Sequence, residues 1–477
     1  MLRLDPASPT PLVQQIVQGL QQLIVVERRL DPGAKLPSIR QFAQTHGVSV
    51  FTVVEAYDRL VALGVLQSRP HAGFFVRQRA GAGSGAGEPG APASPAEALQ
   101  FDARWYLRQI FESRNLEIKA GCGWLPQGWL FETGVRRAFR QLASEGAELG
   151  GYGLPLGHQG LRELVADMLR ERQIEKVSAD SVLLTHGSSQ GLDLLARLLV
   201  KPGDAVLVDE PGYPNIHYIL RFLGARLLPV PRTPQGYDMQ ALEAAIATHR
   251  PRAFFTQPRL QSPTNSVAPL RQLLRILQLA EGADMAIVEN DIYADLDPGL
   301  HPTLASLDQL QRVAYLGSFS KTISPNLRVG YVAARSDCLQ ELALRKMVSG
   351  LTSSDLNERL VHRSLTEGRW RKHLGTLRER LAVAQQRVAR RLQEQGFEIF
   401  STEAQAGLYL WARHAELPDA AELSRDAATQ GIMLGPGHLF HSEALQTGWL
   451  RFNVAFSEDE RLWAFLARAI REQGASA

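Results

Sequence analysis

Residues 318–331 read Ser318-Phe-Ser-Lys-Thr-Ile-Ser-Pro-Asn-Leu-Arg-Val-Gly-Tyr331, and this stretch decides how the larger part of the chain folds. It follows the apolar run Val313–Leu316, which predicts a buried strand. In α/β sheets, ligands bind where a strand ends and the next loop or helix begins. A Ser-x-Ser-Lys motif alone is weak support for a site, because lysines after serines are common on protein surfaces. The prediction of a site therefore depends on other motifs that share this position.

The chain after residue 101 alternates apolar runs with helical stretches, and this alternation predicts an α/β sheet. The predicted strands are Val182–Thr185, Ala205–Val208, Ala253–Thr256, Ala286–Glu289 and Val313–Leu316. Four further motifs follow these strands: Thr185-His-Gly-Ser-Ser-Gln-Gly-Leu192, Glu210-Pro-Gly-Tyr-Pro214, Gln261-Ser-Pro-Thr-Asn265 and Glu289-Asn-Asp-Ile-Tyr293. Their positions agree with one shared site.

Taken in this order, the motifs resemble those of fold-type I aminotransferases, which use pyridoxal 5′-phosphate (PLP). The resemblance spans roughly residues 110–472 and implies a large α/β PLP domain with a smaller C-terminal α+β domain from about residue 345. It implies that Lys321 forms a Schiff base with PLP and that Tyr213 stacks on the pyridine ring. The residues implied to hold the phosphate are Ser188, Ser189, Ser318, Ser320 and Arg328.

The acidic motif departs from the family in its spacing. A carboxylate next to the pyridine nitrogen keeps it protonated and makes the ring an electron sink, and we expect Asp291 in this role. Many aminotransferases place that Asp three residues before the Tyr, where this chain has Asn290. If Asn290 faces the nitrogen instead, the ring is weakly activated. Tyr293 is implied to hydrogen-bond the phenolic oxygen of the cofactor.

The segment Gln261–Asn265 aligns with the family motif Asn-Pro-Thr-Gly, whose Asn also binds that phenolic oxygen. Ser262 replaces this Asn, and Asn265 replaces the Gly. A serine hydroxyl can still donate a hydrogen bond, so cofactor binding is compatible with the change. The two replacements put catalysis in doubt and predict weak or vestigial transamination.

Two residues are implied to complete the site from elsewhere. Arg451, in Leu450-Arg-Phe-Asn453, resembles the arginine that clamps the α-carboxylate of a substrate. Tyr152, in Gly151-Tyr-Gly-Leu-Pro-Leu-Gly157, resembles the residue that reaches the phosphate of a neighbouring subunit. The resemblance therefore implies a homodimer.

The first 79 residues predict a winged helix-turn-helix. Apolar positions at spacings of three and four predict a helix over residues 11–29. Ser38 can cap a short second helix that Gly47 ends, and Ser49 can cap a third that runs through Leu63. A hairpin of Val65–Ser68 and Phe74–Arg77 follows as the wing.

This region, over residues 10–78, resembles the DNA-binding domain of GntR-type regulators. The resemblance implies binding of a double-stranded DNA operator, with the start of the third helix in the major groove. One departure is Val50, where the family usually has an arginine that reads bases. A protein-docking module is the alternative interpretation. The implied DNA contacts are Arg40, Ser49, Thr52, Arg69 and His71.

Residues 80–96 lie between the winged-helix region and the aminotransferase-like region. They are rich in Gly, Ala, Ser and Pro, which predicts a flexible linker. We therefore divide the chain into a winged-helix domain at 1–79, the linker at 80–96 and the aminotransferase-like domain at 97–477. No apolar run is long enough for a membrane span, and two cysteines make no disulfide framework. We expect a cytoplasmic protein without a metal site.

The order of the two resemblances matches the MocR subfamily of transcription regulators. That implies a regulator in which an amino compound, or PLP itself, acts as effector and changes how the front domains hold DNA. A working aminotransferase with an accessory DNA-binding domain is the alternative. A third hypothesis is a body that reports only the supply of free PLP. The sequence does not distinguish activation from repression.

Overall fold

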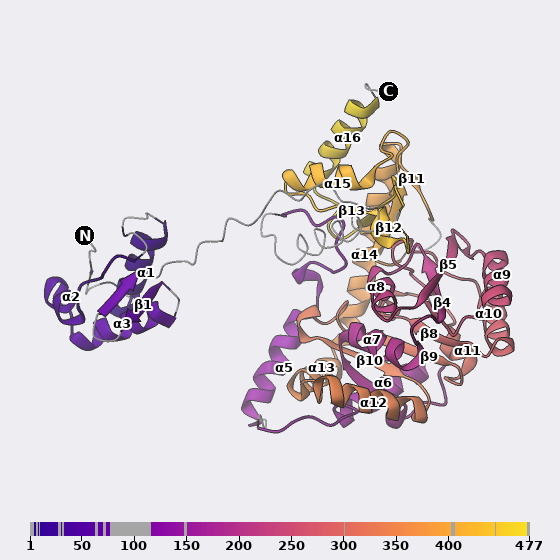
Figure 1. The fold of residues 1–477 in the computed structure, drawn as a ribbon, viewed down its shortest axis with the longest axis horizontal. Helices are drawn as coiled ribbons and strands as arrows, with labels where there is room; N and C mark the ends of the chain where they lie inside the picture. Colours follow the sequence, from indigo (N-terminus) through magenta and orange to yellow (C-terminus); the bar gives the residue numbers. More distant parts are fainter. Residues whose placement is uncertain are drawn as a thin grey trace. The chain divides into compact units, whose positions relative to one another are not determined.

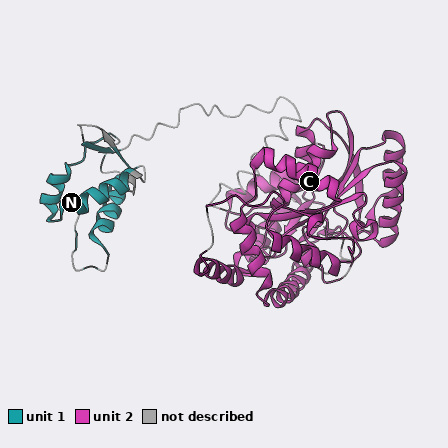
Figure 2. Ribbon diagram, turned by 90° about the horizontal axis from the view of Figure 1, so that it is seen from below, with its two compact units in different colours: residues 1–93 teal, residues 94–477 magenta. Residues whose placement is uncertain are grey.

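Figure 1 shows the helices and strands of the computed structural model, and Figure 2 shows that they form two compact units, residues 1–93 and 94–477. The structure describes residues 4–5, 8, 10–26, 30, 33–62, 65–69, 73–76, 116–146, 150–299, 301–401, 406–443 and 445–474. The predicted linker at 80–96 and the wing residue His71 lie outside these ranges.

The first unit has the predicted helix-turn-helix with a two-stranded hairpin. Ser38 Oγ accepts a hydrogen bond from the Gln41 amide at 3.3 Å, and Gly47 ends that helix in the left-handed region with φ +64°. Ser49 Oγ accepts from the Thr52 amide at 3.0 Å and so caps the third helix. The elements are α1 (Leu12–Gln21), a π-helical turn (Gln22–Val26), α2 (Ile39–His46), α3 (Val50–Ala62), β1 (Leu66–Arg69) and β2 (Gly73–Val76).

One small core holds this unit together. The first helix buries Ile16 and Leu20, and the third buries Val53, Tyr57 and Leu60. The predicted first helix, over 11–29, is α-helical only to Gln21, because the backbone widens into a π turn there. Helical spacing in a sequence does not distinguish these two helix types.

The second unit is built on an eight-stranded sheet with the order β3-β10-β9-β8-β7-β4-β5-β6. Five of its strands, β3, β4, β7, β8 and β9, are the predicted ones. The hydrogen-bond pairing makes β4, β5, β7, β8 and β9 parallel to one another, whereas β10 and β6 are antiparallel to their neighbours. The strands are β3 (Val182–His186), β4 (Ala205–Glu210), β5 (Arg226–Thr233), β6 (Gly236–Tyr237), β7 (Ala253–Thr256), β8 (Ala286–Asn290), β9 (Val313–Ser318) and β10 (Val329–Ala333).

Helices cover both faces of this sheet, because alternate residues of each strand enter different cores. On one face Leu207 and Phe254 pack with α6, α9, α10 and α13; on the other Val208 and Phe255 pack with α7, α8 and α12. The helices are α5 (Glu132–Ser144), α6 (Gln159–Glu171), α7 (Gly187–Leu199), α8 (Pro214–Phe222), α9 (Met239–His249), α10 (Leu270–Gly282), α11 (Leu304–Asp308), α12 (Ser336–Gly350) and α13 (Asp355–Thr366).

A further core belongs to the C-terminal part, around a four-stranded sheet with the order β11-β12-β14-β13. The division falls within α14, since Leu374 packs in the core of the large sheet and Leu377 in the C-terminal core. Residues 118–125 also belong to it. The elements are α14 (Trp370–Glu394), β11 (Glu398–Ile399), β12 (Tyr409–Arg413), α15 (Ala420–Thr429), β13 (Gly435–Pro436), β14 (Leu450–Asn453) and α16 (Glu460–Gly474).

Short 3-10 turns connect several elements, at Gln127–Trp129, Ala179–Ser181, Ala294–Leu296, Pro325–Leu327 and Gly437–Phe440. Among the described helices, none combines the length and the apolar character that crossing a membrane requires.

Candidate functional site

Lys321 follows β9 and is largely buried among other cations. Burial, followed by the nearby charges of Arg451 and Arg328, lowers the pKa of its amine to about 8. Its Nζ donates a hydrogen bond to the Gly123 carbonyl at 2.5 Å and lies 5.5 Å from the centre of the Tyr293 ring. A lysine with this pKa is partly neutral near physiological pH and can act as a nucleophile.

Arg328 lies against the start of α7. The backbone of Gly187 has φ +69°, and a Cβ at this position would be 2.5 Å from Arg328 Nη2. A Cβ at Gly330 would likewise meet the Ser188 amide at 2.6 Å. The two glycines therefore let the segment after Lys321 approach the N-terminus of α7, where backbone N–H groups favour an anion.

Hydroxyl groups surround this helix N-terminus. Ser320 Oγ is buried and has no hydrogen-bond partner within the described residues. Ser318 Oγ accepts from the Ser320 amide at 3.2 Å, while Ser188 and Ser189 lie in the first turn of α7. A buried hydroxyl without a partner, and an arginine at a helix N-terminus, are groups of the kind that bind phosphate.

Tyr213 is the residue before α8 and joins the same cluster. Its hydroxyl accepts from Asn215 Nδ2 at 2.9 Å and is hydrogen-bonded to Ser189. Burial raises the pKa of its phenol, while Ser189, Arg451 and Arg328 lower it. The strand-end motifs around Lys321, Ser189 and Tyr213 are thus close together in space.

Arg451 lies on β14, in the C-terminal part, and is buried. Its guanidinium carbon lies 4.5 Å from the centre of the Tyr409 ring and 4.6 Å from that of Phe440. Its Nη2 donates to the Gly121 carbonyl at 2.7 Å, and its Nη1 donates to Ser262 Oγ at 3.3 Å. Two aromatic rings hold this cation in a fixed orientation.

Tyr293 is paired with a residue that sequence reasoning missed. Its hydroxyl is 2.7 Å from the hydroxyl of Tyr409, and the two rings meet edge to face with centroids 5.8 Å apart. Burial, followed by the nearby Tyr409, raises the pKa of Tyr293. Tyr409 lies on a short apolar strand, β12, where the sequence has no motif to mark it as a site residue.

Asp291 was expected to face the pyridine nitrogen of the cofactor, but its carboxylate is bound by Arg259 and Tyr315. Arg259 donates to both carboxylate oxygens, from Nε at 2.8 Å and from Nη2 at 2.5 Å. The Tyr315 hydroxyl donates to Oδ2 at 2.7 Å. These three donors occupy the carboxylate of Asp291, which is 2% exposed, and hold it in an internal ion network.

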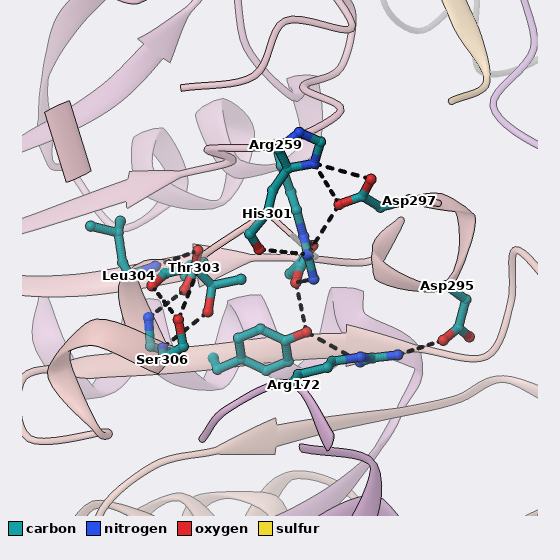
Figure 3. Close-up of polar contacts among 12 residues, drawn as sticks. Arg172, Arg259, Asp295, Asp297, His301, Thr303, Leu304 and Ser306 are labelled. Carbon is teal, nitrogen blue, oxygen red and sulfur yellow. Dashed lines mark hydrogen bonds and ion pairs between the residues drawn. The ribbon is translucent and has the colours of Figure 1, made fainter. Parts of the chain in front are cut away.

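The network continues beyond Asp291, and Figure 3 labels its members Arg259, Asp297, Arg172 and Asp295. Arg259 Nη1 also contacts Asp297 at 3.3 Å, and Asp297 lies 2.9 Å from Nδ1 of His301. On the other side, Arg172 donates to Asp295 at 2.5 Å and to the Tyr315 hydroxyl at 3.3 Å. Charges of both signs alternate along the network, so each buried group has a partner of opposite charge.

Asn290, the alternative candidate, ends β8 and lines a cavity of ≈ 20 Å³ together with Tyr213 and His217. Its Oδ1 is buried and accepts no hydrogen bond from the described residues. Burial also lowers the pKa of His217 to about 4, which keeps the ring neutral. Of the two candidates, Asn290 is therefore the one with an unused polar atom beside Tyr213.

Asn265 has a structural reason to replace the glycine of the family motif. Its backbone has φ +58°, and Asn is one of the few residues that adopt this left-handed conformation readily. Its Nδ2 donates to the Ala406 carbonyl at 2.7 Å, and Gly407 packs against the amide. Ser262, three residues earlier, uses its hydroxyl to accept from Arg451.

Tyr152 is not brought to Lys321 within this chain. Its side chain is 83% exposed, and Leu154, Val348 and Leu351 nearby in the fold are also exposed apolar residues. A side-chain hydrogen bond joins these two stretches, because Lys346 Nζ donates to the Pro155 carbonyl at 3.0 Å. The body thus presents apolar side chains on this part of its surface.

In the first unit, three of the five predicted DNA contacts have described side chains. Arg40 and Ser49 are exposed, and Thr52 is half-buried. The hydroxyls of Ser49 and Thr52 lie 2.7 Å apart and form a hydrogen bond with each other. Arg69 lies on β1, but its side chain, like His71, is outside the described part of the chain.

Two family profiles match the chain and together cover both units. Residues 12–76 match the gntR family of bacterial regulatory proteins, and residues 131–468 match aminotransferase class I and II. The second match spans more than half of the chain, which therefore belongs to that family.

Among similar proteins is the probable rhizopine catabolism regulatory protein MocR of Rhizobium meliloti, 30% identical over 94% of this chain and 91% of that protein. The HTH-type transcriptional regulator YdcR of Escherichia coli is 28% identical over 94% of each chain. The 2-aminoadipate transaminase of Thermus thermophilus is 32% identical but covers 75% of this chain.

The solved structures match the body. That of LysN, an α-aminoadipate aminotransferase of Thermus thermophilus in complex with N-(5′-phosphopyridoxyl)-L-leucine, has a TM-score of 0.70 and 27% identity, over 80% of this chain and 100% of its own. The fold of the second unit is thus that of fold-type I aminotransferases. With a gntR-type domain in front and regulators similar over 94% of its length, the chain is a MocR-type transcription regulator.

Proposed function

We propose that the body holds PLP on Lys321 and that the regulator responds when an amino compound reaches this site. The observation that carries the proposal is the buried Lys321 amine, whose pKa is lowered to about 8 beside Arg451 and Arg328. The similar structure of LysN contains a phosphopyridoxyl group, which supports the same class of cofactor here. The regulator interpretation also agrees with the full-length similarity to MocR.

The residues around Lys321 fit PLP. Ser320 offers an unpartnered buried hydroxyl, and Arg328 lies against Gly187 at the N-terminus of α7, so these residues would hold the phosphate together with Ser188, Ser189 and Ser318. Tyr213 and Tyr293 would contact the ring and its phenolic oxygen. When bound, PLP supplies an aldehyde that condenses with amines and a ring that withdraws electrons.

The ring side of the site favours sensing over turnover. Asp291 is held by Arg259 and Tyr315, so Asn290 is the member of this motif that lines the small cavity. Asp209 also lines this cavity, but its carboxylate accepts hydrogen bonds from Thr256 and the Gln257 amide. A neutral amide does not hold the ring nitrogen protonated as a carboxylate does. In our proposal Asn290 takes the place that the family gives to an aspartate, and Arg451 binds the carboxylate of the effector.

We further propose a homodimer in which Tyr152 reaches the phosphate site of the partner. The exposed Tyr152, Leu154, Val348 and Leu351 support this, because apolar groups of this size are usually covered in a functional assembly. Each dimer would carry two front domains, which suits an operator with two half-sites.

The front domain, residues 1–79, would bind operator DNA through Arg40, Ser49, Thr52, Arg69 and His71, with residues 80–96 as its linker to the body at 97–477. A regulator of transcription works beside the chromosome, so we keep the cytoplasm as its expected location.

The test is the absorbance spectrum of the purified chain with PLP, before and after a panel of amino acids and amines. We expect the wild type to show a band of lysine-bound cofactor that one class of amine changes, and Lys321→Ala to lack it. Lys201→Ala, at an exposed lysine, is the control and should match the wild type. Wild-type protein without any band would refute the proposal, and a turnover rate typical of transaminases would replace sensing by catalysis.

A further inference from the structure

The first unit exposes two large apolar side chains at the start of α3. Phe51 is 76% exposed and Val50 is 49% exposed, while the other large apolar residues described in this unit are buried or half-buried. The two residues are adjacent and together form an exposed apolar patch, and such patches often mark a binding surface. The exposed pair therefore needs an explanation that the fold of the unit does not provide.

The position of the pair follows from the helix geometry. The inner face of α3 carries Val53, Ala56, Tyr57 and Leu60, all at 0% exposure. Val50 and Phe51 lie in the first turn, beside the Ser49 cap. The hydroxyls of Ser49 and Thr52 are bonded to each other, so the side chains of this turn that extend farthest into solvent are apolar.

The charges around α3 indicate which partner fits. Its acidic residues, Glu55 and Asp58, come after the first turn, and Arg59 pairs with Glu55 at 2.7 Å. Arg40, on α2, is exposed. Residues 1–79 contain nine Lys and Arg against five Asp and Glu, a net charge of +4, whereas the whole chain has +3. The first turn of α3 is thus the end of the helix that a polyanion can approach.

We propose that Val50 and Phe51 read thymine methyl groups in the major groove of the operator. The proposal rests on the proposed DNA binding and adds which bases the first turn recognises. Thymine is the base whose edge in the major groove carries a methyl group, and apolar side chains recognise it by contact. Because Val50 has no hydrogen-bonding group, it cannot make the bidentate contact to guanine that an arginine makes there. The preferred site is therefore thymine-bearing where this turn touches the bases.

The experiment begins with selection of binding sequences from a random duplex library by the full-length chain with PLP. Each thymine of the best duplex is then replaced singly by deoxyuridine, which keeps the hydrogen bonds and removes only the methyl group. We expect one or two thymines per half-site whose replacement weakens binding about three- to fivefold, the size expected for one buried methyl group. The replacement at the thymine that Phe51 contacts should leave the binding of Phe51→Ala unchanged, whereas a thymine contacted by Val50 should keep its effect in this variant.

Phe222→Ala is the matched control, since Phe222 is 85% exposed on α8 of the other unit. It should bind the selected duplex like the wild type and keep the response to deoxyuridine. Phe51→Leu, which keeps an apolar side chain, should retain most of that response.

The outcomes separate the two proposals. Sequence-specific binding that ignores every deoxyuridine replacement overturns the thymine contact and leaves DNA binding intact. A Phe51→Ala variant that selects the same sequence with the same sensitivity also overturns it. If the wild type selects no sequence at all, the proposed DNA binding fails, and the thymine contact fails with it.

Discussion

The two ends of the Lys321 site have kept different parts of the aminotransferase pattern. At the end formed by Arg328 and the N-terminus of α7, the arginine packs against Gly187, and Ser188 and Ser189 lie in the first turn of the helix. At the other end, Ser262 stands where the family motif has an asparagine, and Asn290 stands where many aminotransferases have an aspartate. The carboxylate of Asp291 is bound by Arg259 instead. In our proposal one end holds the cofactor, and the other activates it weakly.

This difference teaches how a binding site can be retained while its chemistry changes. A phosphate needs only donors and positive charge, and these are provided by loops and a helix N-terminus. Activation of a ring needs one charged group at one atom, so a single replacement is enough to reduce it. Substitutions at each end should therefore have effects of different kinds.

The largest effect should be the loss of stability in Arg259→Met. This variant tests whether Asp291 has a structural role rather than a role in ligand binding. Removing this guanidinium leaves Asp291 and Asp297 buried beside one fewer positive charge, at a cost of about 3–5 kcal/mol in the free energy of unfolding. Urea unfolding measures it. Arg275→Met, at the exposed ion pair with Glu243, is the control and should cost at most about 1 kcal/mol. Equal stabilities of the two variants would mean that Asp291 has no structural role.

Arg328→Ala should weaken the phosphate end without unfolding the chain. A hydrogen bond to a charged group contributes about 1.5–3 kcal/mol, so the affinity for PLP should fall roughly 10- to 100-fold. Titration of the cofactor-free protein with PLP, followed by absorbance, gives the dissociation constant. Arg335→Ala, which removes an exposed pair with Asp337, should leave it unchanged. An unaltered affinity in Arg328→Ala contradicts the assigned phosphate cradle.

Asn290→Asp should restore activation at the ring end. A carboxylate in this place would favour a protonated ring nitrogen, so the single-turnover rate with an amino acid should rise roughly tenfold or more. The rate is followed by absorbance after rapid mixing. Asp291→Asn provides the comparison, and we expect it to lower stability because Arg259 loses its charged partner. A gain of rate in Asp291→Asn instead would reverse the roles assigned to the two residues.

The pH dependence of PLP uptake should report the Lys321 amine. Its pKa of about 8 lies below the ordinary value of 10.5, so the protonated, unreactive form dominates below pH 8 and the neutral form above it. Uptake by the cofactor-free protein should accelerate about tenfold between pH 7 and pH 9 and then level off. Rapid-mixing absorbance over this range tests it. A rate that continues to rise to pH 10 would indicate an unshifted amine.

Tyr409→Phe should have the smallest effect. It removes only the hydroxyl 2.7 Å from that of Tyr293, a hydrogen bond that contributes about 0.5–1.5 kcal/mol. The affinity for PLP should fall two- to tenfold, with the stability to urea nearly unchanged. A greater loss than in Arg328→Ala would show that the ring end, rather than the phosphate end, dominates binding.

Local signals predicted much of this structure. Ser38, Ser49 and Gly47 mark helix ends through their own hydrogen bonds and conformations, so the caps followed from a few neighbouring residues. Strands β3, β4, β7, β8 and β9 were predicted as short apolar runs, whereas β5 was not. Strand β10 was missed, because it follows a motif whose chemistry gave no sign of a strand that runs against its neighbours.

The orientation of Asp291 could not be predicted from its own motif. It depends on Arg259 and Tyr315, which are 32 and 24 residues away in the sequence. Tyr409 was missed for a similar reason, since its hydroxyl gains a role only when β12 is placed beside Tyr293. Side chains whose partners are distant in sequence require the packed structure before their roles can be assigned.

Residues 116–125 contact both cations of the site, Arg451 and Lys321. The Gly121 carbonyl accepts from Arg451, and the Gly123 carbonyl accepts from Lys321. The same segment hydrogen-bonds to Met433 and Asn453 on either side. This segment is therefore hydrogen-bonded to both cations of the proposed site, and a ligand that binds Lys321 or Arg451 would compete with it directly.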